Sequence, residues 1–572
     1  MLKRIVLGCL FVLLPGAAWA QTLQEGYLPA RSQLYFRWDG MVVHQADFDK
    51  TAAGKTMKGD TGKFLREVWK YAQEQLQNAV KNDPNVGQKA APLLKDFGKL
   101  LGSMYDDGVV FGVEAATINP PVVRAVMVFP KAAGESGTLL PLVQRIAEET
   151  KADVKSNKVG KRFVNHVEVD AIKFGWWAEG QDALLFLGTT DPVAYAKDID
   201  AKKTGVAAHS LYKKVTGFNE FKTATRGYVD ITSILGVASE AAPEAGKIID
   251  ELGLKGVKSV TFVSGFDGPA NRSVVDIDMP GPRTGLLAFT SQRKTSLKDL
   301  PVLPNDVKGF SMTTIKLDTA YDNILNLVDG IARVVAPGEA DNVKEAIKAF
   351  EGTLGVNISK DVFGNLGDLV VSYSSPSDGF LGTGSVIAME VKDGKKLSKT
   401  LENIVKRLPP TPAGDIKIQK KPYYSGEIYQ IQLSGMTSTN IATIGMYKKW
   451  LVYSKYPVAV KGFILRQEGE LPAWKADDAL TKSLQPFPKE FSAIQVSDPR
   501  PTLQTVLSVL PVGFDLINTI ATPLVPGFRP FDLDLIPHPQ EATRHLFPNI
   551  TVTTDDGKRI RSETRGSTLL PF

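Results

Sequence analysis

The stretch LLFLGTTDPVA, Leu184 to Ala194, has a counterpart later in the chain, WLVYSKYPVAV, Trp450 to Val460. The prolines in these two stretches, Pro192 and Pro457, are 265 positions apart. Two apolar runs that end in the same way at a long, fixed offset indicate that the chain repeats itself.

Further matched segments keep the same order along the chain. Leu101-Gly102 and Leu366-Gly367 are also 265 positions apart, and each pair opens a strand-like run. The segment HSLYKKVTGFNEFKTATRGYVDI (209–231) resembles DALTKSLQPFPKEFSAIQVSDP (478–499), with an offset of 268 between Asp230 and Asp498. Several matches in one order and at nearly one offset predict a tandem duplication.

Each predicted copy has the same coarse order of elements. A Leu-Pro segment leads into a strand, long amphipathic helices follow, and the rest is rich in alternating strands. A strand pair with a glycine-containing turn closes each copy, at 261–277 (TFVSGFDGPANRSVVDI) and 549–563 (NITVTTDDGKRIRSE). Strands follow one another as often as they alternate with helices, so we expect an α+β fold. The prediction is two tandem, similar modules of mostly antiparallel sheet with helices packed on one face.

The expected domain boundaries follow from composition. Residues 1–20 are predicted to be a signal peptide and residues 21–290 the first α+β module. Residues 291–303 are polar and then proline-rich, as expected of a linker. Residues 304–572 form the second predicted module, which ends in a β-hairpin.

The first residues of the chain predict export. Lys3 and Arg4 precede an apolar run at 5–14, and Ala18-Trp19-Ala20 then forms an A-x-A cleavage site. We expect cleavage after Ala20, which makes Gln21 the first residue of the mature chain. The apolar run is shorter than the roughly 20 residues that span a bilayer, so a retained anchor is not expected. The expected location is periplasmic or extracellular.

Cysteine usage and charge narrow the function classes. Cys9 is the only cysteine, so the predicted mature chain has no disulfide, thiolate metal site or cysteine nucleophile. The net charge of +6 is spread over interleaved basic and acidic residues. This pattern is typical of a solvated surface, so nucleic-acid binding is not expected.

The segment DKTAAGKT, 49–56, differs from a phosphate-binding loop at one position, because Asp49 stands where the first glycine belongs. Gly54, Lys55 and Thr56 match the pattern. The next clear helix begins only near Asp60, and the second predicted copy has no equivalent GKT. We therefore expect a short helical turn capped by Asp47 or Asp49, with Lys55 exposed, rather than a nucleotide site.

The segment HPQEATRH, 538–545, offers weak candidates for metal ligands. His538 and His545 are seven residues apart, roughly 10.5 Å along a helix, which is too far for one zinc ion. Glu541 and His545, at i and i+4, could supply half of a site. Pro539 is typical of a first helical turn, which makes His538 a residue near the N-cap.

No motif in the sequence predicts a catalytic residue or a cofactor. There is no G-x-S-x-G elbow, and the chain has five histidines. One alternative is a secreted hydrolase in which Asp106 or Asp107 works with Glu114. The second predicted copy has Asp361 and Asp368 in that region, but not in the same register, which weakens this alternative.

Two apolar features are read as packing elements. Trp176 and Trp177 are adjacent strand residues, so they point to opposite faces, and core packing is expected for both. The segment 503–525 contains Gln504, Pro511 and Asp515, which favours a buried or groove-facing helix pair over a membrane span. A peripheral lipid-binding protein that uses this segment is a further alternative.

The chain also resembles a family of exported bacterial proteins that is defined only as a domain of unknown function. The similar features are the Leu-Pro-led strands, the paired Leu-Gly segments, SLQPFPKEF (483–491), MPGPRTGLLAF (279–289) and LIPHPQEATRHLF (535–547). The resemblance covers nearly all of the mature chain. It implies export, an α+β fold and a tandem build, and it implies no catalytic residue.

Together these observations favour an exported, non-enzymatic envelope protein with a binding or scaffolding role. Two similar modules would form a cleft between them, and clefts between domains commonly bind ligands. The expected partner is an envelope protein, polymer or lipid.

Export gives a direct prediction. The mature protein should begin at Gln21 and carry no lipid, because the run that precedes Cys9 is too short for cleavage there. Intact-mass and N-terminal analysis of the protein from its native host tests this. A lipid-modified Cys9 would contradict it.

Overall fold

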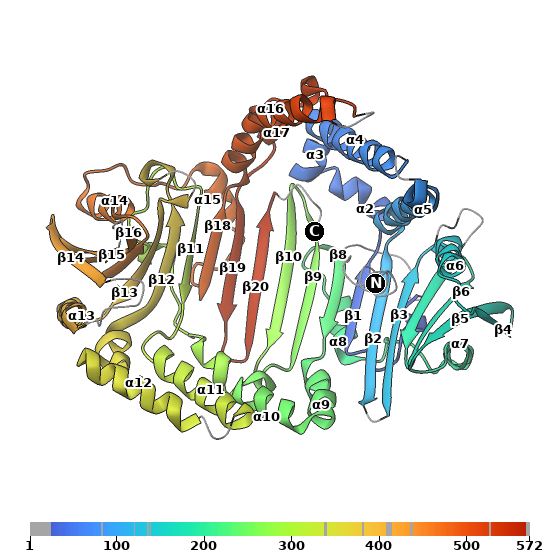
Figure 1. Ribbon diagram of the computed structural model, residues 1–572, viewed down its shortest axis with the longest axis horizontal. Helices are drawn as coiled ribbons and strands as arrows, with labels where there is room; N and C mark the ends of the chain where they lie inside the picture. The colour runs from blue at the N-terminus through green and yellow to red at the C-terminus, as the bar shows by residue number, and fades with distance from the viewer. Residues whose placement is uncertain are drawn as a thin grey trace.

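The computed structural model describes residues 24–567, apart from 82–83, 119, 134–136, 138, 337–339, 380–381, 408–414, 435–438 and 525–527. The predicted signal peptide and its cleavage site at Ala20 and Gln21 lie outside the described residues. Within them, the fold is mixed α and β and is built on one large antiparallel sheet of twenty strands (Figure 1).

The first half of the sheet holds ten strands. They are β1 (Leu34–Trp38), β2 (Val109–Ile118), β3 (Pro121–Phe129), β4 (Lys155–Val159), β5 (Arg162–Val169), β6 (Ile172–Glu179), β7 (Asp182–Gly188), β8 (Lys222–Val229), β9 (Ser259–Asp267) and β10 (Ala270–Asp278). Its helices are α2 (Met41–Phe48), α3 (Ala52–Lys58), α4 (Asp60–Lys81), α5 (Pro84–Asp107), α6 (Leu139–Glu149), α7 (Pro192–Asp200), α8 (Ser210–Thr216), α9 (Ile231–Ala241) and α10 (Pro243–Glu251).

The second half of the sheet also holds ten strands. They are β11 (Gly309–Thr314), β12 (Leu366–Ser374), β13 (Ser385–Val391), β14 (Asp415–Tyr423), β15 (Gly426–Ser434), β16 (Thr439–Tyr447), β17 (Trp450–Ser454), β18 (Ala493–Ser497), β19 (Asn549–Asp555) and β20 (Arg559–Gly566). Its helices are α11 (Ala320–Val335), α12 (Ala340–Leu354), α13 (Gly394–Arg407), α14 (Pro457–Glu468), α15 (Asp478–Leu484), α16 (Pro499–Leu524) and α17 (Pro539–Thr543), and a short 3-10 turn, η9, covers Leu533–Leu535.

The strands of the two halves pair in the same order. In the first half the order is β4-β5-β6-β7-β3-β2-β1-β8-β9-β10. In the second half it is β14-β15-β16-β17-β13-β12-β11-β18-β19-β20. Pro192 begins the helix that follows β7, and Pro457 begins the helix that follows β17.

The two halves are joined at their last strands. β10 and β20 pair antiparallel over eight residue pairs, from Asn271↔Gly566 to Asp278↔Arg559. The sheet therefore continues from one half into the other through this pair of strands. Residues 291–303, expected to be a linker, are attached to the second half, where Thr295 and Phe491 exchange two backbone hydrogen bonds of 2.8 and 3.0 Å.

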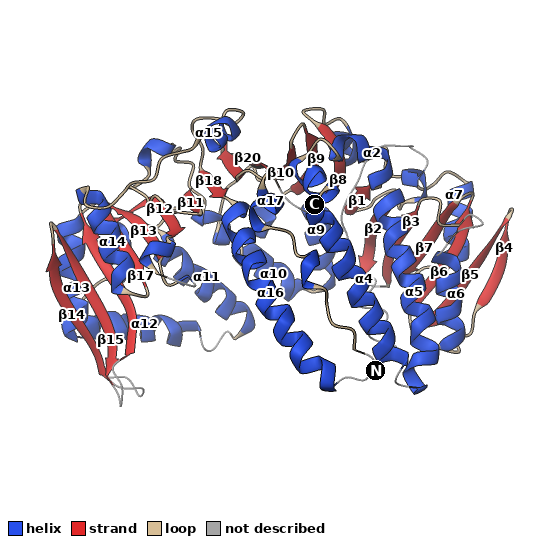
Figure 2. Cartoon of the chain, turned by 90° about the horizontal axis from the view of Figure 1, so that it is seen from above, coloured by secondary structure: helices blue, strands red, loops and turns tan. Residues whose placement is uncertain are grey.

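The sheet bends into an arch, and long helices form a rim at each end of its central strands. Figure 2 shows α4, α5, α10, α11 and α16 on the concave side of the arch. In Figure 1 one rim combines α3 and α4 with α16 and α17, and the other combines α9 and α10 with α11 and α12. Each rim therefore contains helices from both halves of the chain.

Side-chain contacts tie the two halves together within each rim. Phe64 of α4 and Leu507 of α16 belong to one buried cluster. At the other rim, α11 passes so close to α10 that a Cβ on Gly330 would lie 2.0 Å from the Glu251 carboxylate. A larger residue at position 330 would have to displace that flexible side chain.

Helices pack on both faces of the sheet rather than on one, as the two tryptophans show. Trp176 and Trp177 are each 1% exposed, and they lie in two different buried clusters. The cluster around Trp176 includes Leu100 of α5 and Leu139 of α6, whereas the cluster around Trp177 includes Tyr195 of α7. The expected core packing of both tryptophans is confirmed, but the expected one-sided placement of helices is wrong, because short helices after β7 cover the opposite face.

A buried histidine stands out in the first half. His44 of α2 is 1% exposed, its ring contacts the ring of Phe266 at 5.7 Å, and neither ring nitrogen has a hydrogen-bond partner. Burial lowers the pKa of His44 to about 4, helped by the cations Lys222 and Arg226 and opposed by Asp47. The neutral imidazole acts as a core side chain, and its protonated form is disfavoured in the folded protein.

This pKa predicts acid sensitivity. The folded pKa lies below the unfolded value of about 6.5, so the contribution of His44 to stability is complete above pH 6.5 and is lost as the pH falls toward 4. Protonation of His44 should lower the free energy of unfolding by an amount on the order of 3 kcal/mol. Denaturant unfolding of the wild type and of His44→Leu at several pH values tests this. The variant should lose less stability over that interval, and an unchanged acid slope would contradict the assignment.

Candidate functional site

The GKT segment forms a helix and not a phosphate cradle. α3 follows α2 directly, and its N-cap is Thr51, whose hydroxyl accepts a hydrogen bond of 2.9 Å from the Gly54 amide. The expected cap at Asp47 or Asp49 is wrong. Both carboxylates pair with lysines instead, Asp47 with Lys50 and Asp49 with Lys58.

Gly54 has a packing role. A Cβ at this position would lie 2.0 Å from the backbone oxygen of Phe48, so the glycine permits α2 and α3 to touch. Lys55 is exposed, as expected. Gly54 therefore allows two helices to pack closely, whereas Lys55 lies on the surface.

The HPQEATRH segment forms the short helix α17 with His538 at its N-cap and Pro539 at its first position, as expected. Glu541 and His545 are not brought together as ligands. Glu541 pairs with Arg544 at 2.7 Å, and the Arg544 side chain donates a hydrogen bond of 3.0 Å to Nε2 of His545. Within the described residues, no three histidine, cysteine, aspartate or glutamate side chains are grouped as a metal site.

The carboxylates of the hydrolase alternative lie apart. Asp106 and Asp107 end α5, whereas Glu114 lies within β2, roughly 20 Å further along extended chain. Asp107 pairs with Lys131 at 2.7 Å and Glu114 with Arg124 at 3.5 Å. The expected pair of acidic residues is not formed, because a strand separates residues that are close in sequence.

The corresponding acids of the second half are also occupied structurally. Asp361 accepts a hydrogen bond of 2.9 Å from the backbone amide of Asn357. Asp368 accepts one of 3.0 Å from the hydroxyl of Ser291. The first contact closes the start of a helical turn at Asn357, and the second ties β12 to the segment before β11.

A cavity of about 410 Å³ lies in the first half beside the end of α5. Its charged lining residues are Arg37, Asp39, Asp106, Asp107, Lys131, Glu179 and Asp182. Burial raises the pKa of Asp106, with a further contribution from Asp107. Glu179 pairs with Arg162 at 2.9 Å, and Asp182 accepts a hydrogen bond of 2.9 Å from the Lys131 amide. The carboxylates thus fasten neighbouring loops, and no serine, threonine, cysteine or histidine is among the described lining residues.

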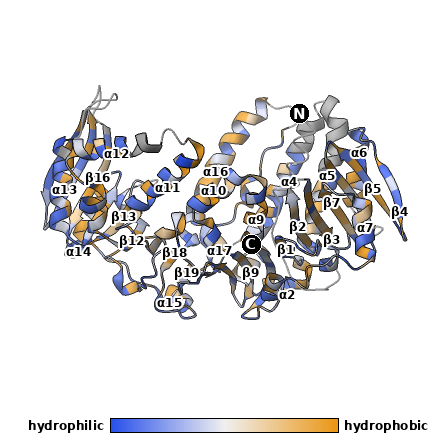
Figure 3. Ribbon diagram, turned by 90° about the horizontal axis from the view of Figure 1, so that it is seen from below, coloured by the Kyte–Doolittle hydropathy of each residue, from blue (hydrophilic) through white to orange (hydrophobic). Residues whose placement is uncertain are grey.

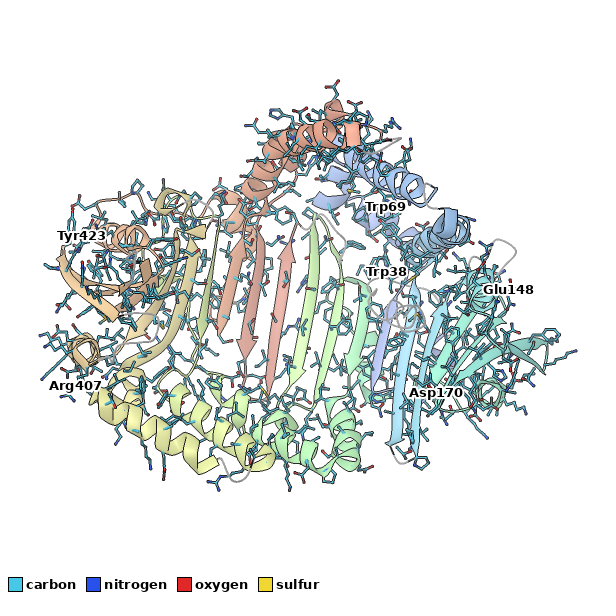
Figure 4. All side chains as sticks on the ribbon, viewed as in Figure 1. Trp38, Trp69, Glu148, Asp170, Arg407 and Tyr423 are labelled. Atoms are coloured by element: carbon cyan, nitrogen blue, oxygen red, sulfur yellow. The ribbon has the colours of Figure 1, made fainter. Side chains whose placement is uncertain are left out.

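A larger feature is the open concave face of the central strands. No helix passes in front of β9, β10, β20 and β19 in Figure 4. One row of directly opposed residues crosses eight strands on this face, and we call it the hydroxyl row. It consists of Ser372, Ser311, Gln495, Thr551, Thr564, Ser273, Ser264 and Thr225, on β12, β11, β18, β19, β20, β10, β9 and β8.

The hydroxyl row contains only neutral hydrogen-bonding groups. Thr551 and Thr564 are hydrogen-bonded at 2.8 Å, as are Ser264 and Thr225. The end of the row lies on the concave side, because Thr225 is directly opposite Trp38, which packs with α5 and α6. The row was missed in the sequence, although the alternation of Thr551 and Thr553 with Ile550 and Val552 indicates a polar face.

The charged residues of the joining strands lie on the opposite face. Arg272 of β10 pairs with Glu563 of β20 at 2.8 Å. Arg565 of β20 pairs with Asp267 at 3.2 Å, and Arg561 pairs with Glu220 at 2.6 Å. Because side chains alternate along a strand, this segregation leaves the concave face of the joint uncharged.

The apolar segment after β18 forms one helix, α16, and not the expected buried or groove-facing pair. Pro511 lies inside it, where a proline removes a single backbone hydrogen bond and the neighbouring contacts of Leu507 and Phe514 hold the helix on both sides. Among the described helices, α16 is the one long and apolar enough to cross a membrane, and only 6% of its apolar window is buried.

The phosphate-loop pattern is tested by a pair of variants. Gly54→Ala should destabilise the protein by about 1–3 kcal/mol through the clash with Phe48, whereas Lys55→Ala should change stability by less than about 0.5 kcal/mol. Denaturant unfolding measures both effects. A magnesium-dependent thermal shift with ATP or GTP that disappears in Lys55→Ala would contradict this reading.

Comparison with known proteins gives no family. No protein-family model and no curated protein matches the chain. Among solved structures, crystal forms III and I of TP0453 align at 7% identity, each with a TM-score of 0.23. The alignments cover 44% and 47% of this chain and 78% and 82% of the TP0453 chain. Scores this low support no conclusion about the present chain.

Proposed function

We propose that this protein is an exported envelope protein with a binding or scaffolding role and without catalytic activity. The supporting observation is an open, uncharged, hydrogen-bonding face across the central strands, bordered by a helical rim at each end. The alternative of a hydrolase has less support, because Asp106 and Asp107 end α5 whereas Glu114 lies inside β2 and pairs with Arg124.

The proposal includes a tandem duplication. It is supported by the identical pairing order of the two sets of strands and by the equivalent positions of Pro192 and Pro457. Two copies joined through their last strands produce a sheet about twice as wide as one copy. The binding surface is then a property of the joined pair and not of either copy alone.

The chemistry of the face indicates its partner. Hydroxyl and amide groups both donate and accept hydrogen bonds, which suits neutral partners rich in the same groups. Anionic partners are usually held by arginine or lysine, and the arginines of β10 and β20 are on the other face. The hydroxyl row crosses eight strands and is roughly 34 Å long, which favours an extended polymer over a small molecule.

We therefore assign the concave face to an uncharged, hydroxyl-rich polymer of the envelope, such as a cell-wall glycan. The exposed Gln495 and the partly exposed Ser273, Thr551 and Thr564 would make the first contacts. Phe262, also partly exposed on this face opposite Val275, adds an aromatic surface against which a sugar ring can pack.

A co-pelleting assay with insoluble cell-wall glycan tests this function. The wild-type protein should pellet, and Ser273→Arg/Thr551→Arg should pellet at least tenfold more weakly, because two charges would replace hydrogen-bonding groups in the row. The matched control, Ser156→Arg/Asn157→Arg, adds the same charge on the exposed edge strand β4 and should pellet like the wild type. Failure of the wild type to pellet, or equal pelleting of the concave-face variant, would contradict the proposal.

A further inference from the structure

We propose that the outward face of α16 is a membrane-docking surface that lies in the plane of a lipid bilayer. This inference is independent of glycan binding, because it concerns a different element and a different chemistry. The helix has 26 residues and is therefore about 39 Å long.

One side of α16 is fixed to the protein. Leu507 is 4% exposed, and Phe514 stacks on Phe531 with a ring distance of 4.3 Å. Asn518 binds the backbone of Phe531 twice, with hydrogen bonds of 3.0 and 2.9 Å. Gln504 donates a hydrogen bond of 2.7 Å to Thr543 of α17. These contacts fix the rotation of the helix about its axis.

The opposite side is an apolar surface that faces solvent, and we call it the outward stripe. Its spacings of mostly three and four residues place the side chains along one side of the helix. The members and their exposed fractions are Val506 (48%), Val509 (60%), Val512 (71%), Leu516 (59%), Ile517 (50%), Ile520 (52%) and Leu524 (71%). Gly513 lies among them, and a Cβ there would meet no atom within 4 Å. Figure 3 shows hydrophobic colour along α16.

The polar groups of the helix are compatible with lipid. Ser508 and Thr505 donate hydrogen bonds of 2.7 and 2.8 Å to backbone oxygens four residues earlier, so their hydroxyls are satisfied within the helix. Asp515 is the one formally charged residue between Arg500 and the end of the helix. On a helical wheel it lies beside Ser508, about 100° from Leu516, and so outside the outward stripe.

The size of the outward stripe distinguishes it from ordinary surface. Seven aliphatic side chains, each about half exposed or more, form an apolar patch on the order of 500 Å². Patches of this size mark sites of interaction with proteins or membranes. A core helix would be mostly buried, and a signal sequence would lie near the N-terminus, so neither explains α16.

A bilayer surface fits the outward stripe better than a protein groove does. Protein interfaces have an apolar centre with a polar rim, whereas this stripe remains apolar for nearly the whole helix. We do not expect α16 to span the bilayer, because its other side is held by α17, η9 and Phe531. A spanning helix would have to break these contacts. A helix with one anchored side and one apolar side is suited to lie in the interface.

The helix that packs beside α16 also exposes an aromatic and a basic side chain. Trp69 of α4 is 60% exposed, and Lys70 follows it with a 62% exposed side chain. Arg529, 70% exposed, joins the segment after α16 to Glu74 of α4 at 3.2 Å. Tryptophan and basic residues are enriched where the apolar interior of a membrane meets water.

Vesicle co-sedimentation tests the inference. The wild type should bind vesicles of phosphatidylcholine and vesicles of phosphatidylethanolamine with phosphatidylglycerol, because the attraction is mainly apolar. Val512→Gln/Leu516→Gln/Ile520→Gln should lower the partition coefficient at least tenfold while it leaves folding intact. The control Phe163→Gln/Val169→Gln/Ile172→Gln, at apolar residues 61%, 58% and 44% exposed on β5 and β6, should bind like the wild type.

A second readout reports insertion directly. The mature chain expected from the sequence has no cysteine, so Leu516→Cys and Ser508→Cys each provide one labelling site. An environment-sensitive dye at position 516 should shift to the blue when vesicles are added, and the shift at 508 should be smaller. The inference is overturned if the wild type binds neither vesicle type, if the triple variant binds like the wild type, or if sedimentation velocity shows a dimer that the triple variant dissociates.

Discussion

The antiparallel pairing of β10 with β20 is the constraint on which the rest of the structure depends. Eight residue pairs join strands that are almost 300 positions apart in sequence. The ion pair between Arg272 and Glu563 fastens the same joint on its charged face. Without this pairing each half would end in an open edge, the arch would not be continuous, and the helices of the two halves would not meet at the rims. The uncharged concave face exists because the two last strands place their charges on the same opposite side.

Local patterns predicted much of the fold, and pairings between distant segments were not predicted. The adjacent tryptophans on one strand indicated core packing, and Pro539 indicated the cap at His538, because each inference needs only neighbouring residues. The joint between β10 and β20 was not foreseen, because strand periodicity gives the face of each residue and not its partner. The acidic candidates failed for a similar reason, since Asp106 and Glu114 are near in sequence but lie at the end of α5 and inside β2.

The segment 503–525 shows that an apolar composition does not reveal what a helix packs against. An apolar helix has the same sequence signal whether its neighbours are protein, lipid or water, and only the contacts of the folded chain decide between them. Leu507 and Phe514 point toward protein, whereas Val512 and Leu516 do not. The hydroxyl row gave no distinctive sequence signal, because serine and threonine are common residues of any solvated strand. The row becomes apparent only when eight strands are placed in register.

The long separation of β10 and β20 along the chain has a consequence for how the protein is made. Until residues 559–566 are available, β10 is an edge strand with unpaired backbone groups, and such edges recruit other strands. The first half also lacks α16 and α17 to cover α4 until late in synthesis. The proposed export through an envelope, N-terminus first, would lengthen this interval. We therefore expect either a chaperone that shields β10 or slow folding of the first half. Both would let β20 pair with β10 before another strand does.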